Sequence, residues 1–493
     1  MHFISTRGNK ENITASKAII NGLCSDGGLY IPTEFPNLRE KLKEFVNLSY
    51  KDLCLEILKL FLDDFTEEEL ITCINKAYDN KFDCKEIAPT TKVKDNFYLE
   101  LYHGPTCAFK DMALTLMPLL LEMSLKKNNI KEEVVILTAT SGDTGKAALE
   151  GFKNLEQIKI IVFFPEDGVS DVQKLQMQSQ EGNNTYVISI NGNFDDAQSA
   201  VKKIFNDEEF ENHLKDNNYI LSSANSINIG RLLPQVVYYF YSYFDLVRNN
   251  HINLNEEINF CVPTGNFGNI LAAYYAKLMG LPIKKLICAS NENNVLYEFF
   301  TTGKYNKNRE LLLTSSPSMD ILISSNLERL LFEISNRDDL KINYLINNLN
   351  NNGFYEIDKD MKKNLYSFYG EYANELEVKK NINKVFKEYN YLIDTHTCVA
   401  YTAYEKYKKA TNDNTLTVIV STASPYKFSK DVLNSLGENI NNLDEFSIIE
   451  KLSQFTVTDI PLPIKKLKTA KVIHNINCEK YEIKEEIKKI LKV

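Results

Sequence analysis

A lysine stands at the head of an apolar helical pattern in the stretch LYHGPTCAFKDMAL, residues 101–114. The N-terminus of a helix carries partial positive charge, so an ammonium group at Lys110 is unfavourable there, and Asp111 offsets only part of that cost. A lysine that works as a neutral amine, or as an imine with an aldehyde, avoids this conflict. The alternative is an ordinary solvated lysine in the first helical turn. Lys110 is therefore a candidate nucleophile that needs support from the rest of the chain.

Two glycine-containing loops follow predicted strands and open predicted helices. The first, TATSGDTGKAALEGF (138–152), offers backbone amides and the hydroxyls of Ser141 and Thr144 to an anion, although a simple helix cap is equally compatible. The second, PTGNFGNILAAYYAK (263–277), contains glycines that allow a tight turn and a close approach of backbone to ligand. Neither has the spacing of a P-loop or of a dinucleotide-binding loop. The second loop therefore predicts a phosphate carried by something other than NAD.

A third loop, SSANSINIGRLLPQ (222–235), contains a different set of donors. The hydroxyls and amides of Asn225 and Ser226, followed by the guanidinium of Arg231, match what a second phosphate requires. A polar helix cap with a solvated arginine is the alternative interpretation.

A lysine that favours its neutral form and a glycine-rich phosphate loop together predict pyridoxal 5′-phosphate. Its aldehyde bonds to a lysine amine, and its phosphate needs amide donors. The stretch VSTASPYKF (420–428) supplies Ser421 and Thr422 at the end of a predicted strand. A hydroxyl facing the pyridine nitrogen leaves that nitrogen largely unprotonated, which favours elimination and replacement reactions.

The elements that must position these loops indicate an α/β fold. The first ninety or so residues are predicted to be mainly helical, most clearly over 50–65, and SDGGLYIP (25–32) predicts a turn entering a short extended segment. Beyond residue 95, short β-branched runs alternate with helical stretches, which is typical of a mostly parallel sheet with helices on both faces. The predicted strands are 134–139, 158–164, 185–190, 258–263, 284–290 and 416–424.

Composition narrows the function further. The chain has 493 residues and a net charge of −9, which argues against nucleic-acid or anionic-membrane partners. We find no secretory signal and no membrane-spanning stretch, and the nine cysteines lack a C-x-x-C pair, so free thiols in the cytoplasm are expected. The six scattered histidines predict no metal site. The Asn-rich stretch 346–353 predicts a polar loop.

An ordered set of motifs resembles the threonine synthases of the longer microbial and fungal type, within the fold-type II pyridoxal-phosphate enzymes. The resemblance covers residues 1 to about 430 and is weakest over 335–390. The matching motifs are FISTRG (3–8), SDGGLYIP (25–32), HGPTCAFKD (103–111), TATSGDTGKAA (138–148), GVSDVQKLQM (168–177), NGNFDDAQ (191–198), SSANSINIGRLLPQ (222–235), PTGNFGNILA (263–272), SPSMDILISSNLERLL (316–331), DTHTCVA (394–400) and STASPYKF (421–428).

The resemblance implies a role for each matching position. Lys110 matches the lysine that carries the cofactor, and Thr422 matches the hydroxyl facing its pyridine nitrogen. The residues matching the loop around the cofactor phosphate are Gly265, Asn266, Phe267, Gly268 and Asn269. The residues matching the substrate site are Asn225, Ser226 and Arg231 at the phosphate of O-phospho-L-homoserine, with Ser141 and Thr144 near its polar groups. Two departures, Ser424 in place of a common His and Thr395 in place of a common Pro, are expected to have little effect.

The resemblance also implies the architecture and the reaction. It predicts a tryptophan-synthase-β-like, two-domain parallel-sheet fold with an extra, mainly helical N-terminal segment. The expected boundaries are 1–95 for the N-terminal domain, 96–127 with 245–493 for the large domain, and 128–244 for the small domain. The implied activity is the conversion of O-phospho-L-homoserine and water to L-threonine and phosphate by a monomer or homodimer. The alternatives are a phosphohomoserine lyase, a serine or threonine deaminase, or a catalytically silent binding protein of the same fold.

Overall fold

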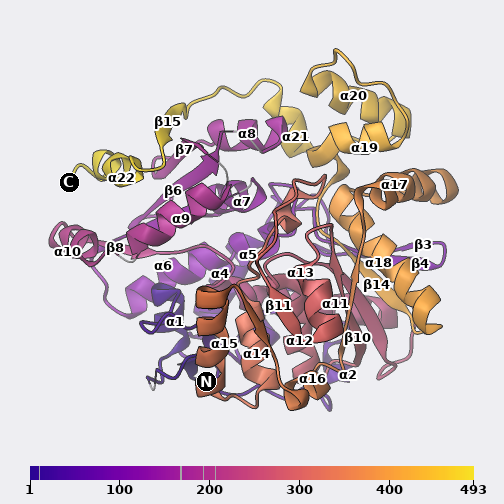
Figure 1. The fold of residues 1–493 in the computed structure, drawn as a ribbon, viewed down its shortest axis with the longest axis horizontal. Helices are drawn as coiled ribbons and strands as arrows, with labels where there is room; N and C mark the ends of the chain where they lie inside the picture. Colours follow the sequence, from indigo (N-terminus) through magenta and orange to yellow (C-terminus); the bar gives the residue numbers. More distant parts are fainter. Residues whose placement is uncertain (10, 141, 167–168, 193, 206) are drawn as a thin grey trace.

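Two sheets form the frame of the molecule in the computed structural model, which describes residues 1–9, 11–140, 142–166, 169–192, 194–205 and 207–493. The larger sheet has the strand order β13-β10-β9-β14-β4-β3, and the smaller has the order β15-β7-β6-β5-β8. Every neighbouring pair is parallel except β3 with β4. Figure 1 shows the smaller sheet, in magenta, beside the larger one.

The strand bounds agree with the predicted runs, so the expected α/β fold is confirmed. The larger sheet consists of β3 (Thr90–Val93), β4 (Asn96–Glu100), β9 (Ile258–Pro263), β10 (Ile283–Ser290), β13 (Phe368–Tyr372) and β14 (Thr417–Ser421). The smaller sheet consists of β5 (Glu133–Ala139), β6 (Ile158–Pro165), β7 (Thr185–Asn191), β8 (Tyr219–Ser222) and β15 (Ile476–Glu479).

Helices cover both faces of each sheet because successive strand residues point in opposite directions and both sets are apolar. In β9, Phe260 and Val262 pack into one core with α11 and α12, whereas Cys261 packs into another with α17 and α18. The helices around the larger sheet are α5 (Asp111–Leu114), α6 (Met117–Lys127), α11 (Ile229–Arg248), α12 (Gly268–Leu278), α13 (Val295–Thr302), α14 (Leu327–Ile334), α15 (Asp339–Asn352), α16 (Lys359–Asn364), α17 (Glu375–Tyr389), α18 (Thr395–Thr411) and α19 (Ser429–Ser435).

The smaller sheet is covered in the same way. Val135 and Ile161 face one core, and Ile136 and Ile160 face the other. Its helices are α7 (Asp143–Phe152), α8 (Asp171–Gln178), α9 (Phe194–Phe205), α10 (Glu208–Asp216) and α22 (Ile483–Leu491). Two further helices, α20 (Glu445–Thr456) and α21 (Leu462–Leu467), lead from α19 to β15 along one edge of the molecule (Figure 1).

The N-terminal segment is mainly helical, as predicted, and docks on the larger-sheet side. Arg7 donates two hydrogen bonds to the carboxylate of Glu328 on α14, at 2.9 and 2.8 Å, which anchors the start of the chain. The segment consists of β1 (Phe3–Ser5), α1 (Ala15–Asn21), β2 (Tyr30–Pro32), α2 (Leu42–Phe45), α3 (Tyr50–Leu58) and α4 (Glu67–Ala77). A second small antiparallel pair joins β11 (Lys304–Asn306) to β12 (Phe354–Glu356).

The predicted polar loop at 346–353 is wrong over most of its length. Helix α15 continues to Asn352 and ends at Gly353, which has φ 80°. Its buried residues Ile342, Leu345 and Leu349 recur every three or four positions, so one apolar stripe holds the helix although asparagines fill its other face. The intrinsic preference of asparagine for turns is outweighed by this packing.

Two strands lie in a different sheet from the one that the predicted boundaries suggest. Strand β3, inside the predicted N-terminal domain 1–95, pairs with β4 of the larger sheet. Strand β15, inside the predicted large-domain segment 245–493, pairs with β7 of the smaller sheet. The division into 1–95, 96–127 with 245–493, and 128–244 stays a prediction.

All nine cysteines are free thiols, and eight of them are buried in the packed interior. No helix in the described part of the chain is both long enough and apolar enough to cross a bilayer. Within the described ranges, no group of three or more His, Cys, Asp or Glu side chains is arranged to hold a metal ion.

Candidate active site

Lys110 lies where two parallel strands of the larger sheet end. The segments that follow β4 and β14 run against each other through a bridge between Ala108 and Ala423. The amide of Phe109 donates to the carbonyl of Thr422 at 2.7 Å. Lys110 and Thr422, which are far apart in sequence, are thereby held on neighbouring segments at the carboxyl edge of the sheet, where ligands collect in α/β folds.

Asp111 fixes the turn that presents Lys110. It accepts hydrogen bonds from the Thr106 amide at 2.8 Å and the Thr106 hydroxyl at 2.5 Å. Gly104 is required beside it, since a Cβ there would lie 2.5 Å from the Asp111 Cβ. Lys110 is the N-cap of α5, a helix of only four residues. The main task of Asp111 is therefore to brace the loop rather than to offset the lysine charge.

The Lys110 amine is buried and faces a shared carboxylate. Its Nζ lies 3.3 Å from Oδ2 of Asp143 and 3.4 Å from Oγ of Ser318, which belongs to the 3₁₀ helix η1 (Pro317–Met319). The other oxygen of Asp143 forms an ion pair with Lys427 at 2.7 Å and accepts from Gln173 at 2.8 Å. Lys110 is 8% exposed, and Lys427, on the 3₁₀ helix η2 (Pro425–Phe428), is fully buried.

Burial and neighbouring cations favour the neutral amine of Lys110. Burial lowers its pKa, and the positive charges of Arg231 and Lys427 lower it further against the opposing attraction of Asp143. Burial would raise the pKa of Asp143, but Lys427 and Lys110 outweigh that effect and hold it well below the usual range. The lowered pKa of Lys110 agrees with the prediction that its environment favours the neutral amine.

The 265–269 loop joins β9 to α12 and is braced from behind by neutral groups. A Cβ on Gly265 would lie 2.9 Å from the backbone oxygen of Ser318, so only glycine fits. The Ser324 hydroxyl donates to the Gly265 carbonyl at 2.8 Å, and the Asn326 side-chain amide donates to the Asn266 carbonyl at 3.1 Å. These contacts fix the loop while its own amides at the start of α12 stay available.

Two residues of this loop have unusual environments. Phe267, the N-cap of α12, has φ 64°, a left-handed conformation that costs energy for a bulky residue and is retained mostly at functional sites. Asn269 is 6% exposed, and its Oδ1 accepts from the hydroxyls of Tyr238 and Tyr239, both at 2.6 Å. Its Nδ2 is buried and has no partner among the described residues. An acceptor such as a phosphate oxygen would satisfy it.

The third predicted loop lies beside the 265–269 loop. A Cβ built on Gly268 would lie 3.6 Å from the Ser226 Cβ. The side chains of Asn225 and Ser226 form no hydrogen bond with the described residues. In the same loop, Asn228 is instead the N-cap of α11, with its Oδ1 accepting from the Gly230 amide at 2.9 Å.

Arg231 is a buried cation with spare donors. It is 5% exposed, donates to the Ala224 carbonyl at 2.9 Å and lies 3.5 Å from the Thr144 hydroxyl. Burial lowers its pKa to about 10, and no carboxylate in the described ranges pairs with it. Because a buried unpaired guanidinium is costly, this position favours an anionic ligand.

The predicted residues therefore gather from separate elements, with some differences in detail. Lys110, Thr144, Arg231 and the Asn225–Ser226 pair surround one region, next to the 265–269 loop. Ser141 lies outside the described residues. Thr422 is buried and its hydroxyl has no hydrogen bond to the described chain, which leaves it available to a ligand. Ser424, in place of the common His, caps η2 by accepting from the Tyr426 amide at 3.4 Å.

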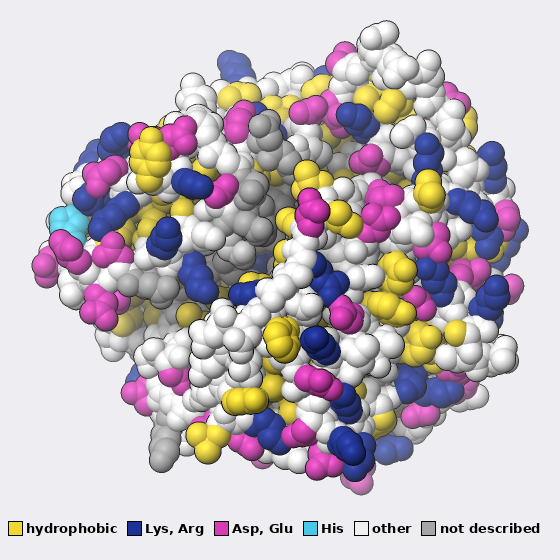
Figure 2. Space-filling model, viewed as in Figure 1, with side chains coloured by type: hydrophobic (Ala, Val, Ile, Leu, Met, Phe, Trp, Pro, Cys, Tyr) yellow, Lys and Arg dark blue, Asp and Glu magenta, His cyan; other side chains and the backbone are white. Residues whose placement is uncertain are grey.

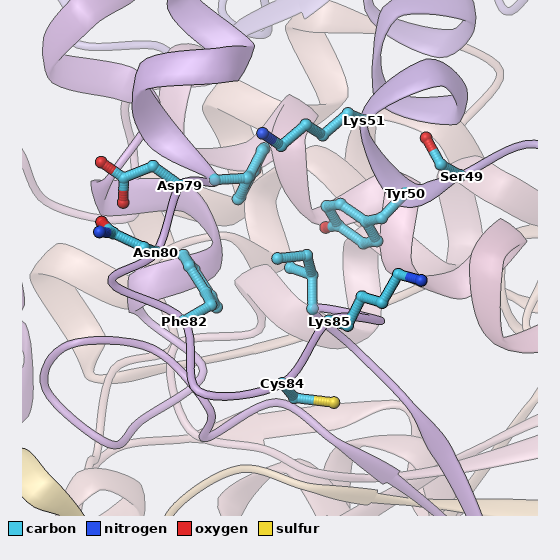
Figure 3. A pocket seen from close by; sticks show the side chains of 10 residues that line it. Ser49, Tyr50, Lys51, Asp79, Asn80, Phe82, Cys84 and Lys85 are labelled. Carbon is cyan, nitrogen blue, oxygen red and sulfur yellow. The ribbon is translucent and has the colours of Figure 1, made fainter.

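A separate hollow of about 400 Å³ lies in the N-terminal segment, shown in Figure 3. It lies between the start of α3 and the stretch after α4. Its lining includes Tyr50, Lys51, Asp79, Cys84 and Lys85. None of the predicted site residues lines it, so the chemistry is placed around Lys110 instead.

Comparison with known proteins agrees with this geometry. Residues 2–78 match the family model described as "Threonine synthase N terminus", and residues 82–344 match "Pyridoxal-phosphate dependent enzyme". Threonine synthase of Saccharomyces cerevisiae is 36% identical over 498 residues, which cover 95% of this chain and 93% of that protein. The chain belongs to the threonine synthase family.

Two further relatives extend the comparison. The crystal structure of pyridoxal-phosphate-bound threonine synthase from Brucella melitensis superposes with a TM-score of 0.87 at 33% identity, covering 100% of both chains. Human threonine synthase-like 1 is 42% identical over 446 residues, covering 88% of this chain. This chain spans about three fifths of the length of that relative, of which 59% is matched.

Pyridoxal 5′-phosphate is the cofactor of this threonine synthase family member, and the residues present fit it. Asp143 is paired with two buried lysines, Lys110 and Lys427, and the buried cation of Arg231 acts on Lys110, which leaves an excess of positive charge for anions. The Asn269 Nδ2, which has no partner among the described residues, and the amides at the start of α12 suit a phosphate, and the buried amine of Lys110 would suit the cofactor aldehyde.

Sequence reasoning missed four residues that contact one another at this candidate site. Asp143, Ser318 and Lys427 surround Lys110, and His396 accepts from the Ser318 amide at 3.2 Å while its Nδ1 lies 2.8 Å from Asp394. All of them lie in motifs quoted for the resemblance. For Asp143 and Lys427, the available signal was an ionisable side chain in a segment that follows a strand, β5 and β14 respectively.

Proposed function

We propose that this chain is a threonine synthase that converts O-phospho-L-homoserine and water to L-threonine and inorganic phosphate. The observation that carries the proposal is a second place for an anion, separate from the cofactor loop. Among the described residues, Arg231 is buried without a carboxylate partner, and the side chains of Asn225 and Ser226 in the same loop form no hydrogen bond. A substrate with its own phosphate accounts for both features, whereas serine or threonine would leave the guanidinium unpaired.

The cofactor is assigned to the residues around Lys110. When bound, pyridoxal phosphate supplies an electron sink next to the amino group of the substrate. Lys110 is the covalent anchor, and Thr422 places its hydroxyl at the pyridine nitrogen. The residues assigned to the cofactor phosphate are Gly265, Asn266, Phe267, Gly268 and Asn269.

The substrate is assigned to the adjoining loops. Arg231, Asn225 and Ser226 bind its phosphate, and Thr144 with Ser141 orients its polar groups. Lys110 Nζ then moves protons at the substrate carbons, taking them from Cα and Cβ. Inorganic phosphate leaves from Cγ, and a proton returns to Cγ. Water then adds its hydroxyl at Cβ and a proton returns to Cα, so one water is consumed for each phosphate released. The buried amine of Lys110 suits this work, since a base must be deprotonated to accept a proton.

The test is a product assay on the cofactor-loaded protein with O-phospho-L-homoserine. We expect equal amounts of L-threonine and phosphate, measured by chromatography and by phosphate colorimetry. Phosphate accompanied by 2-oxobutyrate and ammonia instead of threonine would identify a phosphohomoserine lyase. Pyruvate from serine, or 2-oxobutyrate from threonine, without turnover of the phosphorylated substrate would identify a deaminase. A protein that consumed none of these substrates would be a silent binding protein, contrary to the proposal.

We further propose a cytoplasmic location and a monomeric or homodimeric state, without nucleic-acid or membrane partners. Nine free cysteines support a reducing compartment. Figure 2 shows acidic and basic side chains intermixed over one face, rather than the basic stripe that nucleic acid requires. Cell fractionation and light scattering of the purified protein test these points.

A further inference from the structure

Asp143 is shared by two lysines, and only one of them has a role in the proposed reaction. Its Oδ2 faces Lys110 at 3.3 Å, and its Oδ1 faces Lys427 at 2.7 Å. Both oxygens have an additional neutral donor, Ser318 at 3.3 Å and Gln173 at 2.8 Å. The carboxylate is therefore fully engaged and cannot turn toward one lysine without leaving the other.

Lys427 is held in place by the loop that presents Lys110. It is fully buried, and its Nζ donates to the Thr106 carbonyl at 2.8 Å as well as pairing with Asp143. Thr106 is the residue whose amide and hydroxyl bind Asp111. The position of the Lys427 ammonium is thus fixed relative to Lys110 through a short chain of contacts.

We propose that Lys427 is a positioning residue whose ion pair with Asp143 leaves Lys110 free to give up its proton. This inference rests on the proposed role of Lys110 as the covalent anchor. To bond to the cofactor aldehyde, Lys110 Nζ must first release a proton to solvent. Its lone pair then forms the bond to the aldehyde carbon, and the carbonyl oxygen leaves as water. If Lys110 were the only cation beside Asp143, the carboxylate would strongly favour the protonated form of Lys110. Because Asp143 is already paired with Lys427, it favours that protonated form less.

The other charged groups around Lys110 act in the same direction or are already occupied. Arg231, on α11, adds repulsion that favours the neutral amine. Asp111, on its own loop, is bound to Thr106. The His396–Asp394 pair on the α18 side reaches Lys110 only through Ser318. Asp143 is therefore the one carboxylate among the described residues that pairs with Lys110, and Lys427 is the cation that competes for it.

The test measures cofactor attachment to the full-length, cofactor-free protein instead of threonine formation. Pyridoxal phosphate is added at a series of pH values from 6 to 10, and attachment is followed by visible absorbance. Borohydride reduction and peptide mass spectrometry then confirm that Lys110 carries it. The variants are Lys427→Met, Asp143→Asn and the double variant. The control is Lys406→Met, because Lys406 also binds one carbonyl and one carboxylate, at 2.7 and 2.8 Å, on the distal part of α18.

In Lys427→Met, we expect the apparent pKa for attachment to rise by about one to three units, since Asp143 then attracts Lys110 alone. Lys406→Met should keep the profile of the unmodified chain. The double variant should match Asp143→Asn, because Lys427 acts only through that carboxylate. An unshifted profile in Lys427→Met would show that Lys427 is merely structural and would overturn the proposal.

The double variant keeps the proposal testable if Lys427→Met fails to fold. Removing Lys427 together with Asp143 leaves Lys110 as the one remaining member of this ion-pair group, and a buried amine can stay neutral, so this variant is expected to fold. Different attachment profiles for the double variant and Asp143→Asn would contradict the proposal. Because attachment is measured without any substrate, a negative threonine assay would refute the proposed reaction and leave this inference standing. Attachment at a lysine other than Lys110 would refute both.

Discussion

Two regions meet at the site, and they are held by different forces. The region around Lys110 is built from charges, with Asp143 between two lysines. The 265–269 loop is built from neutral groups, namely backbone carbonyls braced by Ser324 and Asn326. Charge suits a place where a proton must move, since small changes of field shift a pKa. Backbone amides suit a phosphate that stays bound throughout, because they exchange no proton at neutral pH.

The two regions are not independent, because the backbone of one limits the other. Gly265 lies against the Ser318 carbonyl, and the Ser318 hydroxyl lies 3.4 Å from Lys110. Behind the loop, Arg329 donates to the Tyr30 carbonyl at 2.9 Å and the Ile227 carbonyl at 2.6 Å, and it binds the Asn326 side chain. The N-terminal segment thus contacts the 222–235 loop and the Asn326 brace of the 265–269 loop through one buried arginine.

The largest expected effect comes from breaking the charged region at its centre. Lys110→Ala should abolish threonine formation, because the covalent anchor and the base are lost together. The circular dichroism spectrum and the melting temperature should stay close to those of the unmodified chain, since Asp143 keeps its ion pair with Lys427. Measurable turnover above a trace, in the product assay described above, would refute the assignment of Lys110.

Arg231→Ala separates substrate binding from cofactor binding. One charge-assisted hydrogen bond contributes about 1.5–3 kcal/mol, so catalytic efficiency with O-phospho-L-homoserine should fall roughly 10- to 150-fold. Bound cofactor absorbance should be unchanged, because the cofactor phosphate is assigned to residues 265–269. Any activity toward serine should change little. Equal losses with both substrates, or loss of the cofactor absorbance, would assign Arg231 to the fold or to the cofactor.

Two glycines of the neutral region should respond differently to the same methyl group. In Gly265→Ala the new Cβ would lie 2.9 Å from the Ser318 oxygen, so the loop must shift at a cost of about 1–3 kcal/mol. In Gly268→Ala the nearest described atom would be 3.5 Å away, an ordinary contact.

We therefore expect lower melting temperature and roughly tenfold weaker cofactor binding for Gly265→Ala. Gly268→Ala should keep its stability, and any loss of cofactor affinity would report crowding of the phosphate alone. Equal stability of the two variants would contradict the packing described for Gly265. Unchanged cofactor titration in both would remove this loop from the cofactor site.

The smallest expected effect is a pH dependence of the stability that His103 contributes. His103, at the start of the Lys110 loop, lies 2.6 Å from Asp83 and 3.1 Å from Glu100. Burial lowers its pKa, but the two carboxylates outweigh burial and raise it to about 9 from 6.5. A raised pKa stabilises the fold fully below about pH 6.5, and this contribution is lost as the pH rises through 9.

His103→Gln should therefore lower the free energy of unfolding by about 1–2 kcal/mol at pH 6, a value reduced by the exposure of Asp83. The difference from the unmodified chain should shrink toward zero by pH 9.5. Denaturant titrations at the two pH values measure it. A difference that stayed constant with pH would mean that His103 contributes by packing instead of charge.

The sequence predicted the parts of the site that rest on local patterns. The strands, the glycine loop and the placement of Lys110 at a helix start follow from short-range periodicity and turn chemistry. The partners of Lys110 could not be predicted in this way. Lys427 contacts the Thr106 carbonyl across 321 positions, and Ser318 contacts Asp143 across 175. Such contacts depend on the sheet topology, which no local pattern specifies.

The incorrect interpretation at 346–353 has the same origin. Asparagine favours turns in isolation, but the apolar stripe of α15 packs against elements far away in the chain. The pairing of β15 with the smaller sheet could not be predicted either, because a four-residue strand with two exposed side chains shows no clear alternation of apolar and polar residues.

Strand β15 also has a consequence for how the chain is made. It pairs with β7 along the edge of the smaller sheet, and the Asn191–Glu479 contact at this pairing joins residues 288 positions apart. At a synthesis rate of about 5–20 residues per second, the edge of β7 waits roughly 15–60 s for its partner. During that interval the nascent sheet presents an open edge able to pair with other chains. Ribosome-bound intermediates of this protein therefore expose a strand edge that β15 covers in the complete fold.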